Sequence, residues 1–203
     1  MNLSIYSNIN VTFSGASVTG QKISYVTELQ KIYPNWDVSV HSYPSSSMTR
    51  CSTQPVFLKK VDIIFYEWSL HGESTTEEIR EILWLSIKQN SVPVFLHMPR
   101  VDGVKLNLIE KINKLSEKIG ITVIDLRESF SQKQLKDEYL RDNCHPNPLG
   151  AKAYAKFISA KLEEANLRTP KIFDLGYDIK DIKYERVNYL AYKNMSINID
   201  GKI

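Results

Sequence analysis

The hydrophobic pattern of this chain alternates between two periods. Continuous or alternating apolar runs predict β-strands, whereas apolar residues recurring every three or four positions predict helices. Strands alternate with helical segments five times, which is typical of an α/β protein whose parallel sheet is covered by helices on both faces. The expected strands span 9–13, 37–41, 61–68, 92–98 and 121–126, and the expected helices span 19–33, 54–60, 75–89 and 106–119, with a last helix from Pro148.

Local signals mark where several of these elements begin and end. The run 61–68 is almost entirely apolar and is expected to be a central, buried strand. Thr75 or Thr76 is suited to cap the helix over 75–89, and Gly120 to end the helix over 106–119. The helix over 19–33 is expected to bury a stripe that consists of Ile23, Val26, Leu29 and Ile32.

Beyond about residue 170 the helical period disappears and the sequence becomes aromatic and strand-like. We therefore expect an α/β domain over 1–169 and a β-rich extension, or the start of an appended β domain, over 170–203. Exposed strand edges invite pairing with another chain, so this extension is also a candidate surface for a homo-oligomer.

Composition narrows the range of functions. The 203 residues carry a net charge of only +3 with no basic stripe, which argues against a nucleic-acid partner. No secretory leader or membrane span is visible, so a cytoplasmic protein without a membrane partner is expected. The two cysteines, Cys51 and Cys144, are expected to be reduced. Four scattered histidines lack metal-ligand spacing, so neither a metal nor a cofactor is expected.

Candidate chemistry lies just before the last helix. Asp142 precedes His145 by three residues, a spacing that lets a carboxylate orient an imidazole for proton transfer. Ser17 follows the first predicted strand, at the edge of a parallel sheet where sites of open α/β folds lie, and just before the predicted helix. A serine hydroxyl becomes a good nucleophile when such a base takes its proton. The three residues therefore indicate nucleophilic catalysis.

These residues carry a resemblance to a known family. Gly15-Ala16-Ser17 and the signature Asp142 through Gly150, which contains Pro-Asn-x-x-Gly, resemble the SGNH (GDSL-like) hydrolases over about residues 9–165. The resemblance implies a flavodoxin-like three-layer α/β/α sandwich with a five-stranded parallel sheet. It also implies ester cleavage through an acyl-enzyme, with Ser17 as nucleophile, His145 as base and then acid, and Asp142 as orienter.

The same resemblance concerns the groups that stabilise the oxyanion. The backbone N–H of Ser17 would be one donor. The family has a Gly after the second strand and an Asn after the third, and neither is present here. Ser45 and His71 occupy the nearest positions and are the candidate oxyanion or substrate-binding residues.

Two further residues near this chemistry have open roles. Glu67, at the end of the third predicted strand, is either a buried acid with a perturbed pKa or an ion-pair partner. Cys144 is expected to serve packing, with its side chain directed away from His145.

The substrate that fits is a small-molecule or glycan ester. O-acetyl groups on carbohydrates are frequent targets within the resembling family, and Tyr43, Trp68 and the polar loop 42–47 would line an aromatic-edged cleft suited to a sugar. Two alternatives stay open. The same triad could transfer an acyl group to a glycan as an O-acetyltransferase, or the fold could be a non-catalytic glycan-binding or assembly module with a degenerate oxyanion hole.

Overall fold

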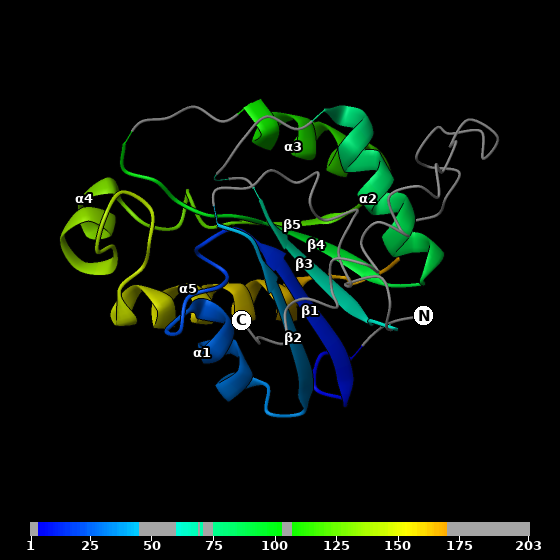
Figure 1. Ribbon diagram of the computed structural model, residues 1–203, viewed down its shortest axis with the longest axis horizontal. Coiled ribbons are helices and arrows are strands. Elements are labelled where there is room, and N and C mark those ends of the chain that lie inside the picture. The colour runs from blue at the N-terminus through cyan, green and yellow to red at the C-terminus, as the bar shows by residue number, and fades with distance from the viewer. Residues whose placement is uncertain (1–3, 45–59, 69, 71–74, 103–106, 170–203) are drawn as a thin grey trace, which may run out of the picture.

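A computed structural model describes residues 4–44, 60–68, 70, 75–102 and 107–169 (Figure 1). In this part of the chain one parallel sheet has the strand order β2-β1-β3-β4-β5. The α/β class and the central position of the most apolar strand are thereby confirmed. The strands are β1 (Ile9–Gly15), β2 (Trp36–Ser42), β3 (Ile63–Glu67), β4 (Val92–His97) and β5 (Thr122–Asp125).

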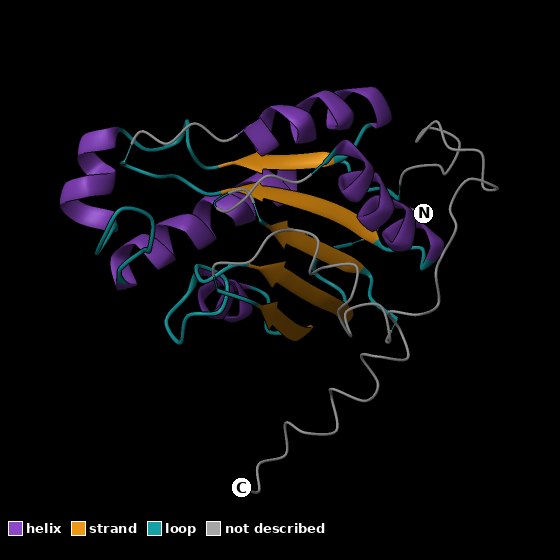
Figure 2. Cartoon of the chain, turned by 45° about the horizontal axis from the view of Figure 1, so that its top comes forward, coloured by secondary structure: helices purple, strands orange, loops and turns teal. Residues whose placement is uncertain are grey.

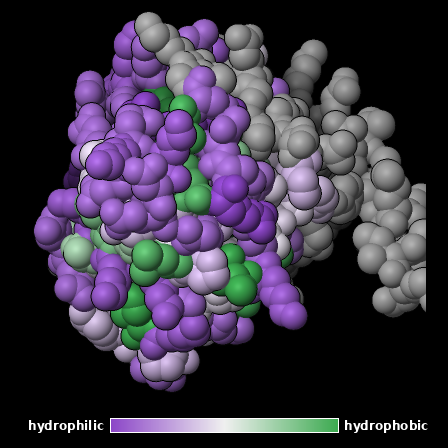
Figure 3. Space-filling model, turned by 90° about the vertical axis from the view of Figure 1, so that its left-hand side faces the viewer, coloured by the Kyte–Doolittle hydropathy of each residue, from purple (hydrophilic) through white to green (hydrophobic). Residues whose placement is uncertain are grey.

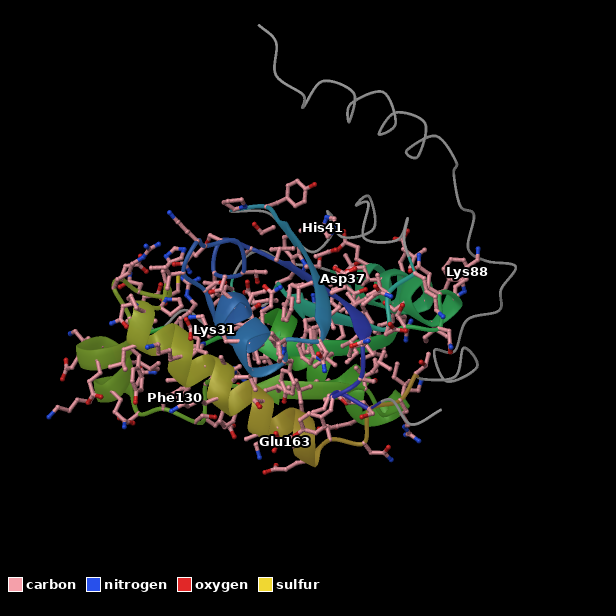
Figure 4. The ribbon with its side chains drawn as sticks, turned by 90° about the horizontal axis from the view of Figure 1, so that it is seen from below. Lys31, Asp37, His41, Lys88, Phe130 and Glu163 are labelled. Carbon is pink, nitrogen blue, oxygen red and sulfur yellow. The ribbon has the colours of Figure 1, made fainter. Side chains whose placement is uncertain are left out.

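Helices cover both faces of the sheet, which makes three layers (Figure 2). One face carries α1 (Tyr25–Ile32) and α5 (Pro148–Glu164), and the other carries α2 (Thr76–Lys88) and α3 (Asn107–Ile119). Seen from below, α1 with Lys31 lies beside α5 with Glu163, and β2 with Asp37 and His41 runs at the outer edge (Figure 4).

The sheet has a hydrophobic core on each face, and alternating side chains of β3 pack into one or the other. Ile63 and Phe65 pack with residues of α1 and α5, while Ile64 and Tyr66 pack with residues of α2 and α3. The ring of Phe65 stacks on that of Phe13, with centroids 4.6 Å apart. Truncating such a buried phenylalanine to alanine costs roughly 3–5 kcal/mol. Burial on both faces explains why the sequence of this strand is almost continuously apolar.

Helix α2 begins and α3 ends as their signals predict. The hydroxyl of Thr75 accepts the N–H of Glu78, and the Glu78 carboxylate accepts the N–H of Thr75, which forms a capping box. After α3, Gly120 adopts a φ of +71°, a left-handed conformation that glycine reaches without strain.

Helix α1 differs from its expected span. It begins at Tyr25 rather than at residue 19, because Ser24 caps it through the N–H of Thr27. The expected apolar stripe is wrong in part, since Ile23 and Ile32 are 51% and 41% exposed. Capping at Ser24 leaves Ile23 outside the helix. The buried face consists of Tyr25, Val26 and Leu29, with Tyr33 just beyond the end.

A compact segment between β5 and α5 was not expected. It contains α4 (Gln132–Gln134) and the π-helical turn η3 (Leu135–Tyr139), whose buried Leu135 anchors it to the core. The expected helix over 54–60 and the extension over 170–203 lie outside the described residues, so the domain boundary stays a prediction. Among the described residues, no helix has the length and apolar character needed to cross a bilayer.

Candidate active site

The first three strands in the sheet order end level with one another. Gly15, the last residue of β1, pairs with Ser42 of β2 on one side and with Glu67 of β3 on the other. Ser17 follows two residues later, at the edge toward which the strands run. Ser17 was expected directly before a helix, but residues 17–24 form turns and bends ahead of α1. Figure 3 faces this edge, where the surface is mainly hydrophilic with small separate hydrophobic patches.

The segment that carries His145 is a closed turn ahead of α5. Leu140 and Pro146 form an isolated antiparallel bridge, and the N–H of Arg141 donates to the carbonyl of His145 at 3.0 Å. The N–H of Val101, which follows β4, donates to the carbonyl of Asn143 at 3.0 Å. These bonds fix the backbone on which Asp142 and His145 stand.

The residues after His145 attach this turn to the helix. The Asn147 side-chain oxygen accepts the N–H groups of Leu149 and Gly150 at 2.9 Å each, and its amide donates to the carbonyl of Glu138 at 2.7 Å. A Cβ at Gly150 would lie 2.1 Å from the carbonyl oxygen of Tyr139. The Pro-Asn-x-x-Gly pattern therefore has a physical reason: the helix start must be capped and must approach η3 closely.

Ser17, His145 and Asp142 lie in one hydrogen-bonded chain. The hydroxyl oxygen of Ser17 is 2.7 Å from Nε2 of His145, across 128 residues of sequence. Nδ1 of His145 is 2.9 Å from both carboxylate oxygens of Asp142. The side chains of His145 and Asp142 are 23% and 48% exposed, so the site is open to solvent.

The Asp142 carboxylate is held in its charged form. Partial burial acts to raise its pKa, but the N–H groups of Cys144 and His145 and the His145 ring outweigh this effect, so the pKa lies below its usual value. A carboxylate that stays charged can keep the proton of the imidazole on Nδ1, which leaves Nε2 to accept a proton from Ser17.

Solved structures share this architecture. No family model and no curated protein matches the sequence. A two-domain esterase active on acetylated mannans superposes with a TM-score of 0.63 and 15% identity over 77% of this chain, which spans 48% of that protein's length. A Slackia heliotrinireducens protein assigned to the SGNH hydrolases gives a TM-score of 0.62 and 16% identity, with 77% of this chain and all of that chain covered.

A third solved structure is the C-terminal catalytic domain of a Streptococcus pneumoniae peptidoglycan O-acetyltransferase. Its TM-score is 0.58 at 16% identity, with 81% of this chain and 99% of that chain covered. The fold is that of the SGNH hydrolases. At these identities the likeness concerns the fold alone, so the chemistry of this SGNH fold must be argued from its own residues.

Cys144 lies closer to the imidazole than expected. Its sulfur is 3.7 Å from Nδ1 of His145, so the expectation that it points away is wrong. Burial, and then the charge of Asp142, raise the pKa of the thiol, and a neutral thiol is a weak nucleophile. The Asp142, Cys144 and His145 ligand atoms all lie within 4.8 Å of one another. A metal there would compete with the bond between His145 and Asp142.

Trp68 and Glu67 are both fully buried. The expectation that Trp68 lines an open cleft is therefore wrong. Trp68 packs in the core beneath α2 and α3 and donates its ring N–H to the Ser14 hydroxyl. For Glu67 the structure decides between the two open roles. It is a buried acid, and among the described residues it takes part in no ion pair.

Of the three expected oxyanion donors, only the N–H of Ser17 lies within the described residues. Ser45 and His71 both lie outside the described residues, so their roles stay predictions. The backbone N–H of Ser17 finds no acceptor among the residues that the structure describes, which leaves it available to a ligand. Thr19, which sequence reasoning missed, hydrogen-bonds Glu67 at this edge. No motif in the sequence marks it, because its partner is distant along the chain.

Proposed function

We propose that this protein is a serine-dependent ester hydrolase that removes O-acetyl or other small acyl groups from a carbohydrate. The observation that carries the proposal is the chain of short contacts from the Ser17 hydroxyl through the His145 ring to Asp142. A serine within hydrogen-bonding distance of a base that is itself oriented by a carboxylate is the arrangement that nucleophilic acyl transfer requires.

The reaction would proceed in two halves. Nε2 of His145 takes the proton of Ser17 as the hydroxyl oxygen attacks the ester carbonyl, and the same proton then passes to the departing sugar oxygen, which leaves as a hydroxyl. Water next gives its proton to Nε2 and attacks the acyl-enzyme, which releases a carboxylic acid and restores Ser17. Asp142 keeps Nδ1 protonated and stabilises the imidazolium in both halves.

The oxyanion of each tetrahedral intermediate needs preorganised donors, which often supply the largest part of catalysis. We assign the Ser17 N–H as one donor and propose Ser45 and His71 as the others. The proposal of a carbohydrate acyl ester draws support from the fold neighbours, one active on acetylated mannans and one a peptidoglycan O-acetyltransferase domain.

A Ser17→Ala variant tests the assignment. We expect it to lose cleavage of p-nitrophenyl acetate and labelling by a fluorophosphonate probe, with an unchanged circular dichroism spectrum. Ser7→Ala is the matched control, because Ser7 is exposed and precedes β1 at the opposite edge of the sheet. Turnover by Ser17→Ala equal to that of Ser7→Ala would refute the proposal.

The alternative functions are acyl transfer to a glycan and non-catalytic glycan binding. The same purified wild-type protein can be used to distinguish them. Incubation with an acetyl donor and a glycan acceptor distinguishes the routes, since transfer consumes the donor only when the acceptor is present. Absence of fluorophosphonate labelling in the wild type, together with retained glycan binding, would instead favour a non-catalytic module.

A further inference from the structure

Glu67 lies directly beneath the loop that carries Ser17. It is the last residue of β3 and is paired in register with Gly15. The N–H of Ala16 donates both to the main-chain carbonyl of Glu67, at 3.1 Å, and to its carboxyl oxygen Oε2, at 3.2 Å. One residue of β3 therefore fixes the main-chain N–H of the residue immediately before Ser17 through two acceptors.

The same carboxyl oxygen also holds the chain on the other side of Ser17. The Thr19 hydroxyl donates to Oε2 of Glu67 at 2.8 Å, and the Thr19 main-chain N–H is directed at the same carboxyl group. The Thr19 hydroxyl oxygen is also 2.8 Å from the Tyr25 hydroxyl. Because a hydroxyl has one proton, Tyr25 donates to Thr19 when Thr19 donates to Glu67. All three side chains are buried.

Gly15 leaves room for this network. A Cβ at position 15 would lie 2.2 Å from the Thr19 hydroxyl oxygen and 2.9 Å from the Glu67 carbonyl oxygen. Any larger residue would push Thr19 away from Glu67. The glycine two residues before the candidate nucleophile is thereby explained by the approach of Thr19, not by an unusual backbone angle.

We propose that Glu67 is a positioning residue for the nucleophile: its carboxyl group holds the backbone at Ala16 and Thr19 so that the Ser17 hydroxyl stays within hydrogen-bonding distance of His145. The inference rests on the proposed function, because it requires Ser17 to be the nucleophile. Misplacement of a reacting group by about 1 Å can lower a rate by about 10²-fold. Freedom of the backbone at Ala16 and Thr19 to move would therefore lower the rate.

The electrostatic setting of Glu67 adds a second property. Among the described residues, the titratable groups that interact with it are the Tyr25 phenol from α1 and the Cys144 thiol from the turn before α5, and neither is a cation. Burial raises the pKa of Glu67 to about 8, although hydrogen bonds from Thr19 and Ala16 oppose the rise. At neutral pH a neutral carboxyl group therefore holds the loop without placing a negative charge near a developing oxyanion.

This setting predicts how activity depends on pH. As pH rises through about 8, Glu67 loses its proton, and the new charge opposes the oxyanion, so kcat falls. Oε1 of Glu67 has no hydrogen-bond partner among the described residues, so it can carry the proton while Oε2 continues to accept.

Two substitutions at position 67 test the proposal. Glu67→Gln keeps an acceptor oxygen of the same shape and cannot ionise, so we expect near-wild-type kcat at pH 7 and no fall in kcat near pH 8. Glu67→Ala removes the acceptor, and we expect a loss of about 10²-fold in kcat with little change in KM. The proposal would be overturned if kcat fell as much in Glu67→Gln as in Glu67→Ala. It would also be overturned if the fall in kcat near pH 8 persisted in Glu67→Gln.

A matched pair at Thr19 gives an independent test should Glu67→Ala fail to fold. Thr19→Val removes the hydroxyl donor at nearly constant volume, whereas Thr19→Ser retains it. We expect kcat to fall in Thr19→Val and to be preserved in Thr19→Ser, with both variants folded at the assay temperature by circular dichroism. Equal kcat values in the two variants would count against the proposal.

The rate of fluorophosphonate labelling separates failure of this proposal from failure of the proposed function. If wild-type Ser17 is not labelled, the proposed function itself is wrong. If wild-type Ser17 is labelled and folded Glu67→Ala and Thr19→Val are labelled equally fast, only the positioning role of Glu67 is wrong. Slower labelling in Glu67→Ala and Thr19→Val, with recovery in Glu67→Gln and Thr19→Ser, supports the proposed function and the positioning role of Glu67.

Discussion

The carboxylate of Asp142 holds His145 at two points. Its Oδ1 accepts the main-chain N–H of His145 at 2.8 Å and lies 2.9 Å from Nδ1 of the ring. The same oxygen accepts the N–H of Cys144 at 3.0 Å. A single side chain thus shapes the turn and orients the imidazole, and a spacing of three residues between Asp142 and His145 permits both contacts.

Replacement of Asp142 by asparagine should separate these two tasks. An asparagine oxygen can still accept the main-chain N–H groups, but the neutral amide no longer stabilises an imidazolium. We expect kcat for an acetyl ester to fall by up to about 10⁴-fold, the loss that the same change causes in a serine protease, with little change in melting temperature. Asp142→Ala should lose activity and also stability. Wild-type kcat in Asp142→Asn would exclude this residue from the reaction.

Asn147 should contribute to stability through two separable contacts. Asn147→Ala loses the cap of α5 and the bond to the Glu138 carbonyl, so we expect the free energy of unfolding to fall by about 1–2 kcal/mol. Asn147→Asp keeps the cap and loses only the amide donor, so its loss should be smaller. Urea denaturation of both variants measures the difference, and equal losses would assign the whole effect to the bond with Glu138.

Cys144 should be dispensable for the chemistry despite its nearness to His145. Burial and the charge of Asp142 raise the pKa of its thiol, so the thiolate is scarce at neutral pH. We expect Cys144→Ala to retain most of the esterase activity and to lose some stability through the buried volume it vacates. Loss of fluorophosphonate labelling at Ser17 in a folded Cys144→Ala variant would show that the thiol takes part.

Glu67 should make stability fall as pH rises from 4.5 to about 8. Burial raises its pKa from an ordinary value of 4.5 to about 8, so the folded protein holds a proton that the unfolded chain releases. Its contribution is fully present below pH 4.5 and is lost as pH rises through 8. Between these values the free energy of unfolding should fall by about 1.4 kcal/mol per pH unit relative to Glu67→Gln. Parallel pH profiles of the two proteins in urea denaturation would contradict the assignment.

Much of the fold could be predicted from local pattern. The continuous apolar run of β3, the capping box at Thr75 and the glycine after α3 each act within a few residues, so they are readable in the sequence. The start of α1 was placed too early although the cap at Ser24 is local, because the turns ahead of it are held partly by the contact of Thr19 with Glu67, which is distant in sequence. The η3 turn was missed because one buried leucine, Leu135, gives no periodic signal.

By itself, the sequence determined the alternation of strands and helices, the start of the last helix at Pro148 and the spacing of Asp142 and His145, because each depends on neighbours along the chain. Only the tertiary structure decided that Ser17 meets His145 at 2.7 Å, that Trp68 is buried and that Glu67 is buried beneath the loop that carries Ser17. Those outcomes depend on which strand ends lie side by side and on how little water reaches them. The order of the strands in the sheet and the exclusion of water from their ends are not encoded within any short stretch of sequence.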